Sequence, residues 1–172
     1  MGSTTPLYTD LNPFRVAIIG GGIGGLTTAL SLAHHCPNGL LSISVYEQAP
    51  AYKEIGAGIG IGVNASRILH RIGVGNAVNA ISGERDGIHR SNRRWDNGDE
   101  IVTIEAMDDP ENKEIRQTSV HRAEFLEILV NAVQENKIAT LFTNKRVVKV
   151  EVCIYIYLCF LGTPHAFWKF QF

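Results

Sequence analysis

The sequence is poor in cysteine, in net charge and in long apolar segments, and each shortage excludes a class of protein. Its three cysteines, Cys36, Cys153 and Cys159, form no C-x-x-C pair and are too few for a disulfide framework. A formal net charge of −1, with no basic block, predicts neither nucleic acid nor an anionic membrane as a partner. An apolar run from Val152 to Leu161 is ten residues long, too short for a helix that crosses a bilayer.

Two further absences bear on location and chemistry. Residues 1–13 contain no apolar core like that of a signal peptide, so we expect a flexible lead-in and a cytoplasmic protein. The six histidines form no metal-like pair with acidic neighbours, and nothing before Glu151 resembles an activated nucleophile or a paired acid and base. The sequence therefore predicts no metal site and no catalytic residue, and any chemistry would come from a bound cofactor.

Residues 14–47 carry the strongest pattern in the chain. An apolar run leads directly into Gly20, Gly22 and Gly25 at G-x-G-x-x-G spacing. Apolar residues then recur at helical spacing, and an alternating segment that ends at Glu47 follows. This order predicts a strand, a tight turn, a helix and a second strand, which is the β-α-β unit of a Rossmann-like α/β fold.

Each residue of this pattern has a physical role in dinucleotide binding. Gly20 permits the sharp turn, Gly22 lets a pyrophosphate approach the backbone, and Gly25 lets the helix pack closely on the strand. Glu47 stands 22 positions after Gly25, where a carboxylate can accept hydrogen bonds from an adenosine ribose and repel a 2′-phosphate. The pattern therefore favours FAD or NAD over NADP.

Glycine occupies every second position from Gly56 to Gly62, with apolar residues between. If the segment is extended, Gly58 and Gly60 lie on a bare face that a flat ligand or another backbone could approach. A glycine loop without a partner is the alternative. We expect a short helix to follow, with Asn64 as its N-cap. Its inner face would consist of Ile68, Leu69 and Ile72, with Gly73 ending the helix.

The pattern changes near Asn79, and strand-like alternation with a turn at Asp96 to Gly98 predicts an antiparallel excursion. Arginines beside Trp95 in this segment are consistent with an acidic aromatic substrate or, more simply, with a solvated strand edge. A second helix is expected from Arg122 to Asn136. A cation in its first turn opposes the helix dipole, so Arg122 should have an anionic partner, either a cofactor phosphate or a carboxylate. Further strands are predicted at 139–143, parallel to those at 14–20 and 41–47, and at 146–151.

Five segments in this order, IIGGGIGGLTTALSLA, VYEQAP, EIGAGIGIGVNASRIL, RRWDNGDEI and VHRAEFLEIL, resemble the N-terminal third of the FAD-dependent aromatic-ring monooxygenases, especially the salicylate hydroxylase-like branch. The resemblance implies that the glycine motif holds the ADP part of FAD and that Glu47 holds its ribose. It implies that the stretch with Gly58 and Gly60 runs near the flavin and that Arg122 contacts the cofactor. NADH or NADPH as co-substrate, a small aromatic substrate and no metal are also implied.

The resemblance divides the chain into an FAD-binding domain at 14–78 and 119–151 and a partial substrate-domain excursion at 79–118. Family members continue with Asp-Gly and Gly-Asp motifs that are absent after Glu151, so we expect a truncated fragment that is inactive by itself. Residues 152–172 are expected to be an aberrant apolar tail, encoded by a translated intron or a gene-model error. An NAD-dependent dehydrogenase and a noncatalytic dinucleotide-binding module are the alternative functions.

Overall fold

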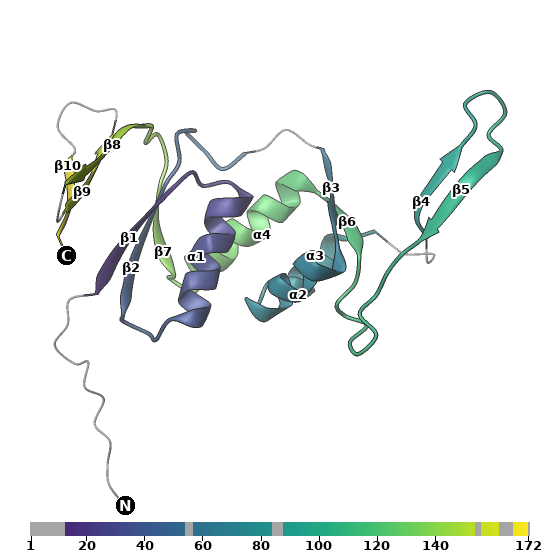
Figure 1. The fold of residues 1–172 in the computed structure, drawn as a ribbon, viewed down its shortest axis with the longest axis horizontal. Coiled ribbons are helices and arrows are strands. Elements are labelled where there is room, and N and C mark those ends of the chain that lie inside the picture. Colours follow the sequence, from purple (N-terminus) through teal and green to yellow (C-terminus); the bar gives the residue numbers. More distant parts are fainter. Residues whose placement is uncertain (1–12, 54–56, 84–87, 154–155, 162–166, 172) are drawn as a thin grey trace, which may run out of the picture. The chain divides into compact units, whose positions relative to one another are not determined.

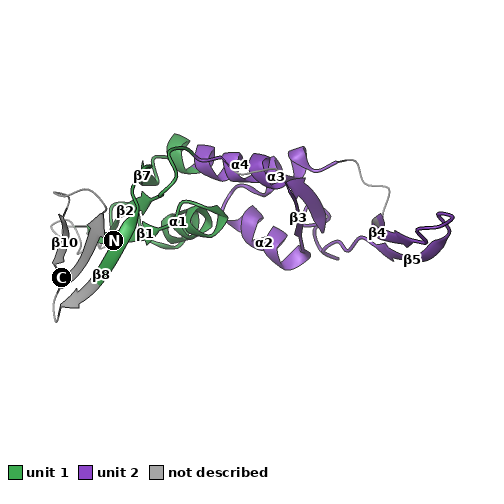
Figure 2. Ribbon diagram, turned by 90° about the horizontal axis from the view of Figure 1, so that it is seen from above, with its two compact units in different colours: residues 1–51, 133–172 green, residues 52–132 purple. Residues whose placement is uncertain are grey.

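A computed structural model describes residues 13–53, 57–83, 88–153, 156–161 and 167–171, without the side chains of residues 89 and 151–172. The chain divides into two compact units, coloured separately in Figure 2: residues 1–51 with 133–172, and residues 52–132. The second boundary falls inside a helix, between Ala132 and Val133. In the part of the chain that the structure describes, no helix is both long and apolar enough to cross a membrane.

The first unit is built on a parallel sheet, as predicted (Figure 1). Strands β1 (Phe14–Ile19), β2 (Leu41–Tyr46) and β7 (Ala139–Phe142) lie in the order β1-β2-β7. β2 pairs with both neighbours in parallel register, and as the central strand it buries Ile43, Val45 and Tyr46. The predicted α/β fold with a parallel sheet is therefore confirmed.

Helix α1 (Ile23–His35) packs on this sheet, with contacts to β1 and β2. Its buried residues are Leu26, Ala29 and Leu30, whose spacing places them on one face. The turn after the helix has Gly39 at φ +83°, and the N–H of Leu40 donates to the carbonyl of Pro37. The expected helix and turn are both present.

A second, antiparallel sheet in the first unit has the order β10-β9-β8. Its strands are β8 (Val147–Cys153), β9 (Ile156–Leu161) and β10 (Phe167–Gln171). Most of this sheet comes from the segment that we expect to be an aberrant tail. The side chains of residues 152–172 lie outside the described residues. The origin of this segment stays a prediction.

The second unit combines short strands with helices. β3 (Gly58–Ile61) pairs antiparallel with β6 (Thr118–His121), and helices α2 (Val63–Arg71), α3 (Gly75–Ile81) and α4 (Arg122–Glu135) complete it. Its buried apolar residues from the strands and from α2 and α3 are Ile61, Leu69, Val78 and Val120. α3 and β6 were not predicted, because seven and four residues are too few to show a period.

The start of α2 corrects two expectations. The N-cap is Gly62, not Asn64, because the helix begins directly after β3 and Asn64 already lies in its first turn. Ile68 was expected on the inner face but is 50% exposed. The buried face is set instead by Ser66 and Leu69, which are three positions apart. As predicted, Gly73 follows the helix end, at φ +87°.

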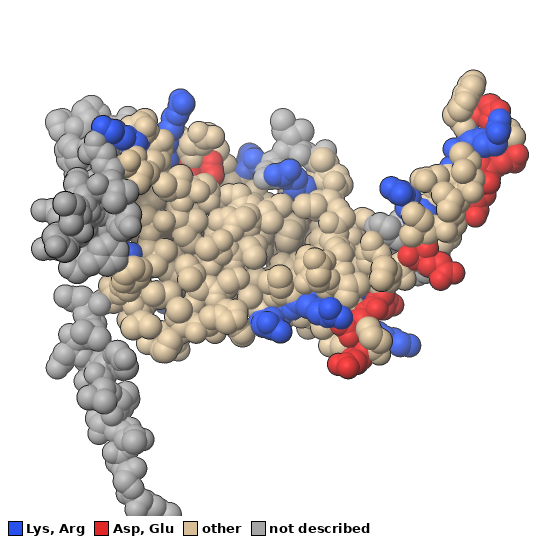
Figure 3. Space-filling model, viewed as in Figure 1, with Lys and Arg blue, Asp and Glu red and all other residues tan. Residues whose placement is uncertain are grey.

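The antiparallel excursion is a hairpin of β4 (Ile88–Arg93) and β5 (Glu100–Glu105). Its turn is where we expected it, and Gly98 there has φ +79°. Trp95 is 98% exposed, and the Arg94 guanidinium lies 2.8 Å from the Asp96 carboxylate. Acidic and basic side chains lie close together along this hairpin in Figure 3. These observations favour a solvated edge over a substrate-binding cluster.

Candidate functional site

The glycine turn joins β1 to α1 in the first unit. The N–H of Gly20 donates to the carbonyl of Tyr46 at 2.8 Å, so the turn is attached to the end of β2. Gly22 is the N-cap of α1 with extended backbone angles, φ −74° and ψ −173°. No side chain caps the helix and its first turn has no acidic residue. The first N–H groups of α1 are therefore suited to an anionic ligand.

The three glycines of the motif meet different demands. Gly20 has φ +97°, a conformation that residues with a side chain rarely adopt. A Cβ at Gly25 would collide with the carbonyl oxygen of Gly20 and lie 3.2 Å from Cγ2 of Ile18. A Cβ at Gly22 would have no atom within 4 Å. The fold explains glycine at positions 20 and 25, whereas at position 22 no packing contact within the chain requires it.

Glu47 lies directly after β2 and is bonded to the glycine turn. Its Oε2 accepts the N–H of Gly21 at 2.7 Å, and its Oε1 accepts the N–H of Ala49 at 2.8 Å. Its own N–H donates to Phe142 and its carbonyl accepts the N–H of Lys145, both at 2.8 Å. The carboxylate is therefore held on a backbone that is fixed to β7.

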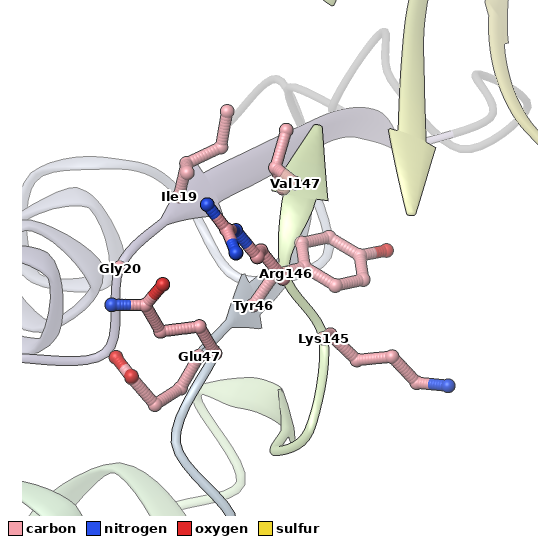
Figure 4. A pocket seen from close by; sticks show the side chains of 8 residues that line it. Ile19, Gly20, Tyr46, Glu47, Lys145, Arg146 and Val147 are labelled. Carbon is pink, nitrogen blue, oxygen red and sulfur yellow. The ribbon is translucent and has the colours of Figure 1, made fainter. Parts of the chain in front are cut away.

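A cavity of about 390 Å³ opens at this edge of the sheet, between the turn, Glu47 and the end of β7. Tyr46 and Phe142, neighbours on β2 and β7, stack their rings with centroids 5.2 Å apart. In Figure 4 the Arg146 side chain extends toward Ile19 and Gly20, whereas Lys145 extends the other way. The cavity is lined by Ile19, Gly20, Tyr46, Glu47, Gln48, Lys145, Arg146 and Val147.

Sequence reasoning missed several of these lining residues, including Gln48, Lys145 and Arg146. A signal was present, because Lys145 and Arg146 closely follow the predicted third parallel strand. The carboxyl ends of parallel strands meet at one edge of a sheet, and ligands of open α/β sheets bind there. Both cations therefore belong to the same edge as Glu47.

The second unit brings together the other predicted residues, Gly58, Gly60 and Arg122. Gly58 pairs with His121 and Gly60 with Ser119, and the N–H of Arg122 donates to the carbonyl of Ala57 at 2.9 Å. Gly58 and Gly60 are exposed, and a Cβ at either would have no atom within 4 Å. The predicted bare glycine face is therefore present, beside the start of α4. Gly56 lies outside the described residues.

Ser119 and His121 border this bare face, because directly paired residues project to the same side of a two-stranded ribbon. Both are exposed, whereas Thr118 and Val120 on the other side are buried.

Within the described residues, no group of three or more His, Cys, Asp or Glu side chains is arranged to hold a metal ion.

Comparison with known proteins gives a consistent set of relatives, although no family model matches the chain. The chain is 36% identical over 128 residues to salicylate hydroxylase of Pseudomonas putida, a match that covers 70% of this chain and 26% of the relative. It is 35% identical over 127 residues to 6-hydroxynicotinate 3-monooxygenase of Pseudomonas fluorescens, covering 73% and 31%. It is 37% identical over 132 residues to 6-methylsalicylate 1-monooxygenase of Aspergillus terreus, covering 73% and 28%.

Solved structures share the fold at lower identity. The flavin-dependent monooxygenase PieE, in complex with FAD and substrate, matches with a TM-score of 0.70 and 19% identity over 88% of this chain and 27% of its own. The p-nitrophenol 4-monooxygenase PnpA from Pseudomonas putida DLL-E4 matches with a TM-score of 0.71 and 14% identity, over 91% and 38%. The resemblance predicted from sequence is confirmed: the chain is homologous to part of the FAD-dependent aromatic-ring monooxygenases and spans about a third of the length of these relatives.

Proposed function

We propose that this chain binds FAD through the ADP half of the cofactor, as part of an aromatic-ring hydroxylating monooxygenase. The observation that carries the proposal is the open space at Gly22 beside the uncapped start of α1. A pyrophosphate there would accept backbone N–H groups and meet the positive end of the helix dipole. Glycine at position 22 is unexplained by packing, so a ligand that presses against the backbone accounts for it.

The remaining residues fit the rest of an ADP group. The carboxylate of Glu47 would accept hydrogen bonds from the ribose hydroxyls, and it disfavours a 2′-phosphate by like charge. The cavity at the end of β2 and β7 would receive the adenosine, with the side chains of Ile19 and Val147 as apolar surface. FAD or NAD satisfies these contacts equally, and similarity to monooxygenases rather than dehydrogenases favours FAD.

In the second unit, we assign the bare face of Gly58 and Gly60 to the flavin part of the cofactor and Arg122 to a cofactor contact. Bound flavin would supply electron transfer from NADH or NADPH to oxygen for hydroxylation of a small aromatic ring. The chain's own contribution is to bind and orient the cofactor through backbone groups and Glu47. A cytoplasmic location remains a prediction from the N-terminal sequence.

Titration of FAD with the purified chain, followed by flavin fluorescence, tests the proposal. We expect saturable binding that excess ADP reverses, and loss of binding in Gly22→Val because the valine fills the pyrophosphate space. Thr28→Val, which places the same side chain six positions further along the chain, at an exposed position of α1, is the matched control and should bind FAD as the wild type does. Binding of NADH without binding of FAD would favour the dehydrogenase alternative, and wild-type affinity in Gly22→Val would refute the site.

A further inference from the structure

The carboxylate of Glu47 bonds to the backbone of the protein through both of its oxygens. One oxygen accepts the N–H of Gly21 at 2.7 Å and the other accepts the N–H of Ala49 at 2.8 Å. Both distances are in the range of charge-assisted hydrogen bonds, which are stronger than bonds between neutral groups. Gly21 is buried and Glu47 is partly buried, so water competes poorly for these donors.

The Glu47 backbone is anchored on the side opposite the turn. Its N–H donates to the carbonyl of Phe142 at the end of β7, and its carbonyl accepts the N–H of Lys145 in the segment that follows β7. The side chain therefore extends from a fixed point toward the glycine turn. The N–H of Gly20, the residue before Gly21, donates to the carbonyl of Tyr46, so Gly20 is also bonded to the end of β2.

We infer that Glu47 is a positioning residue that holds the glycine turn in its binding conformation before any cofactor arrives. This role goes beyond ribose recognition and is separate from it. An ionised carboxylate has about four lone-pair sites, of which the two backbone N–H groups use two. Two sites remain for the hydroxyls of a ribose, so the positioning role and the proposed binding role are compatible. A ligand would meet a preformed turn, which lowers the entropic cost of binding.

The inference also separates the N–H groups of the turn into two sets. Those of Gly20 and Gly21 are already directed at the end of β2, to Tyr46 and Glu47. The N–H groups at the start of α1 have no acceptor within the helix. An anionic group would therefore be bound by the α1 set, while the Gly20 and Gly21 set maintains the shape of the turn.

Amide hydrogen exchange in the ligand-free protein tests this positioning role without reference to FAD. In Glu47→Ala, exchange at Gly21 and Ala49 should accelerate roughly tenfold to hundredfold, since each amide loses a bond to a charged acceptor. Exchange at Val45, in the buried centre of β2, should stay within about twofold of the wild type if the fold is intact. Gln48→Ala is the matched control, because Gln48 is exposed and adjacent to Glu47, and it should leave exchange at Gly21 and Ala49 unchanged.

Glu47→Gln decides the matter if the alanine variant does not fold. The glutamine amide keeps the shape of the side chain but has one acceptor oxygen, so at least one of the Gly21 and Ala49 amides should lose protection. Unchanged exchange at both amides, or acceleration at Val45 equal to that at Gly21, would overturn the inference. Failure of FAD to bind the wild-type chain would refute the proposed function and leave this exchange result intact.

Discussion

The carbonyl oxygen of Gly20 occupies the space that a Cβ atom at Gly25 would need. The first and third glycines of the motif are therefore constrained by each other, across the turn that joins β1 to α1. At Gly22, which lies between them in the sequence, a Cβ atom would have no other atom within 4 Å. The motif thus contains two glycines that the fold requires and one that it does not.

This difference predicts unequal losses of stability for two similar substitutions. Gly25→Val should lower the free energy of unfolding by roughly 1–3 kcal/mol or more, because the side chain overlaps backbone that cannot move freely. Gly22→Val should change it less, since the extended backbone at position 22 accepts a side chain and only the N-cap preference for glycine is lost. Urea unfolding followed by circular dichroism measures both variants. Equal losses of stability would contradict the separation of roles.

Features whose geometry is set by the local backbone could be predicted from the sequence. Gly20 and Gly25 are needed by a turn whose geometry is set within a few residues, so the β-α-β unit could be predicted from spacing alone. Asn64 and Ile68 were misassigned because the start of α2 is fixed by its direct connection to β3. The helix starts two residues earlier than expected, which changes the residue that caps it, and its contacts with the rest of the unit decide which residues face inward.

Features that depend on distant segments could not be read in this way. The bond from Gly21 to Glu47 joins residues 26 positions apart, and the pairing of β3 with β6 joins two segments of four residues. Lys145 and Arg146 line the cavity because β7 lies next to β2 in the sheet. No periodicity in the sequence reports the bond from Gly21 or the pairing of β3 with β6. The position of Lys145 and Arg146 after the predicted third parallel strand did indicate their place, but only the motif side of the site was predicted.

The bare face of β3 provides a second test in the other unit. Gly60→Val should be tolerated by the fold, since valine favours strands and nothing lies within 4 Å of its Cβ. It should weaken FAD binding if the flavin lies against this face. Flavin fluorescence titration gives the affinity, and Thr140→Val, an exposed substitution on β7, is the control. Unchanged affinity in Gly60→Val would remove this face from the site.

Arg146 should contribute to cofactor affinity through its charge. Its side chain is exposed and extends toward Ile19 and Gly20, so Arg146→Ala should weaken FAD binding by roughly 0.2–1 kcal/mol. The loss should shrink at high salt, because exposed charges are screened. Lys113→Ala, an exposed cation in the other unit, should have no effect at any salt concentration. An equal loss in both variants would mean that the effect is general electrostatics.

Asp109 predicts a pH-dependent contribution to stability. Asp109 is buried, and its carboxylate accepts hydrogen bonds from the backbone N–H of Glu111 and from the guanidinium of Arg67. These two bonds, the first more than the second, lower the pKa of the carboxyl below its usual range. A pKa that is lower in the folded than in the unfolded state stabilises the fold above about pH 3.9, and the contribution is lost as pH falls through the folded value. The stability difference between wild type and Asp109→Asn should therefore be largest at neutral pH and shrink as the pH falls below about 3.9.

Asp96 is the matched control for that measurement. The pKa of its carboxyl is also lowered, chiefly by Arg94, but the pair lies exposed at the hairpin turn. Exposed pairs contribute little to stability, so Asp96→Asn should leave the unfolding curve nearly unchanged between pH 3 and 7. A larger effect at Asp96 than at Asp109 would contradict the role assigned to burial.

The central claim is that the glycine turn and Glu47 form the binding site for the ADP part of FAD. Backbone amide chemical shifts of the ¹⁵N-labelled chain, recorded as ADP is added, test it most directly. The account predicts the largest saturable shifts at Gly22 to Gly25, with further shifts at Glu47 and Val147. Shifts that are absent from the turn, or that cluster on other parts of the chain, would contradict it.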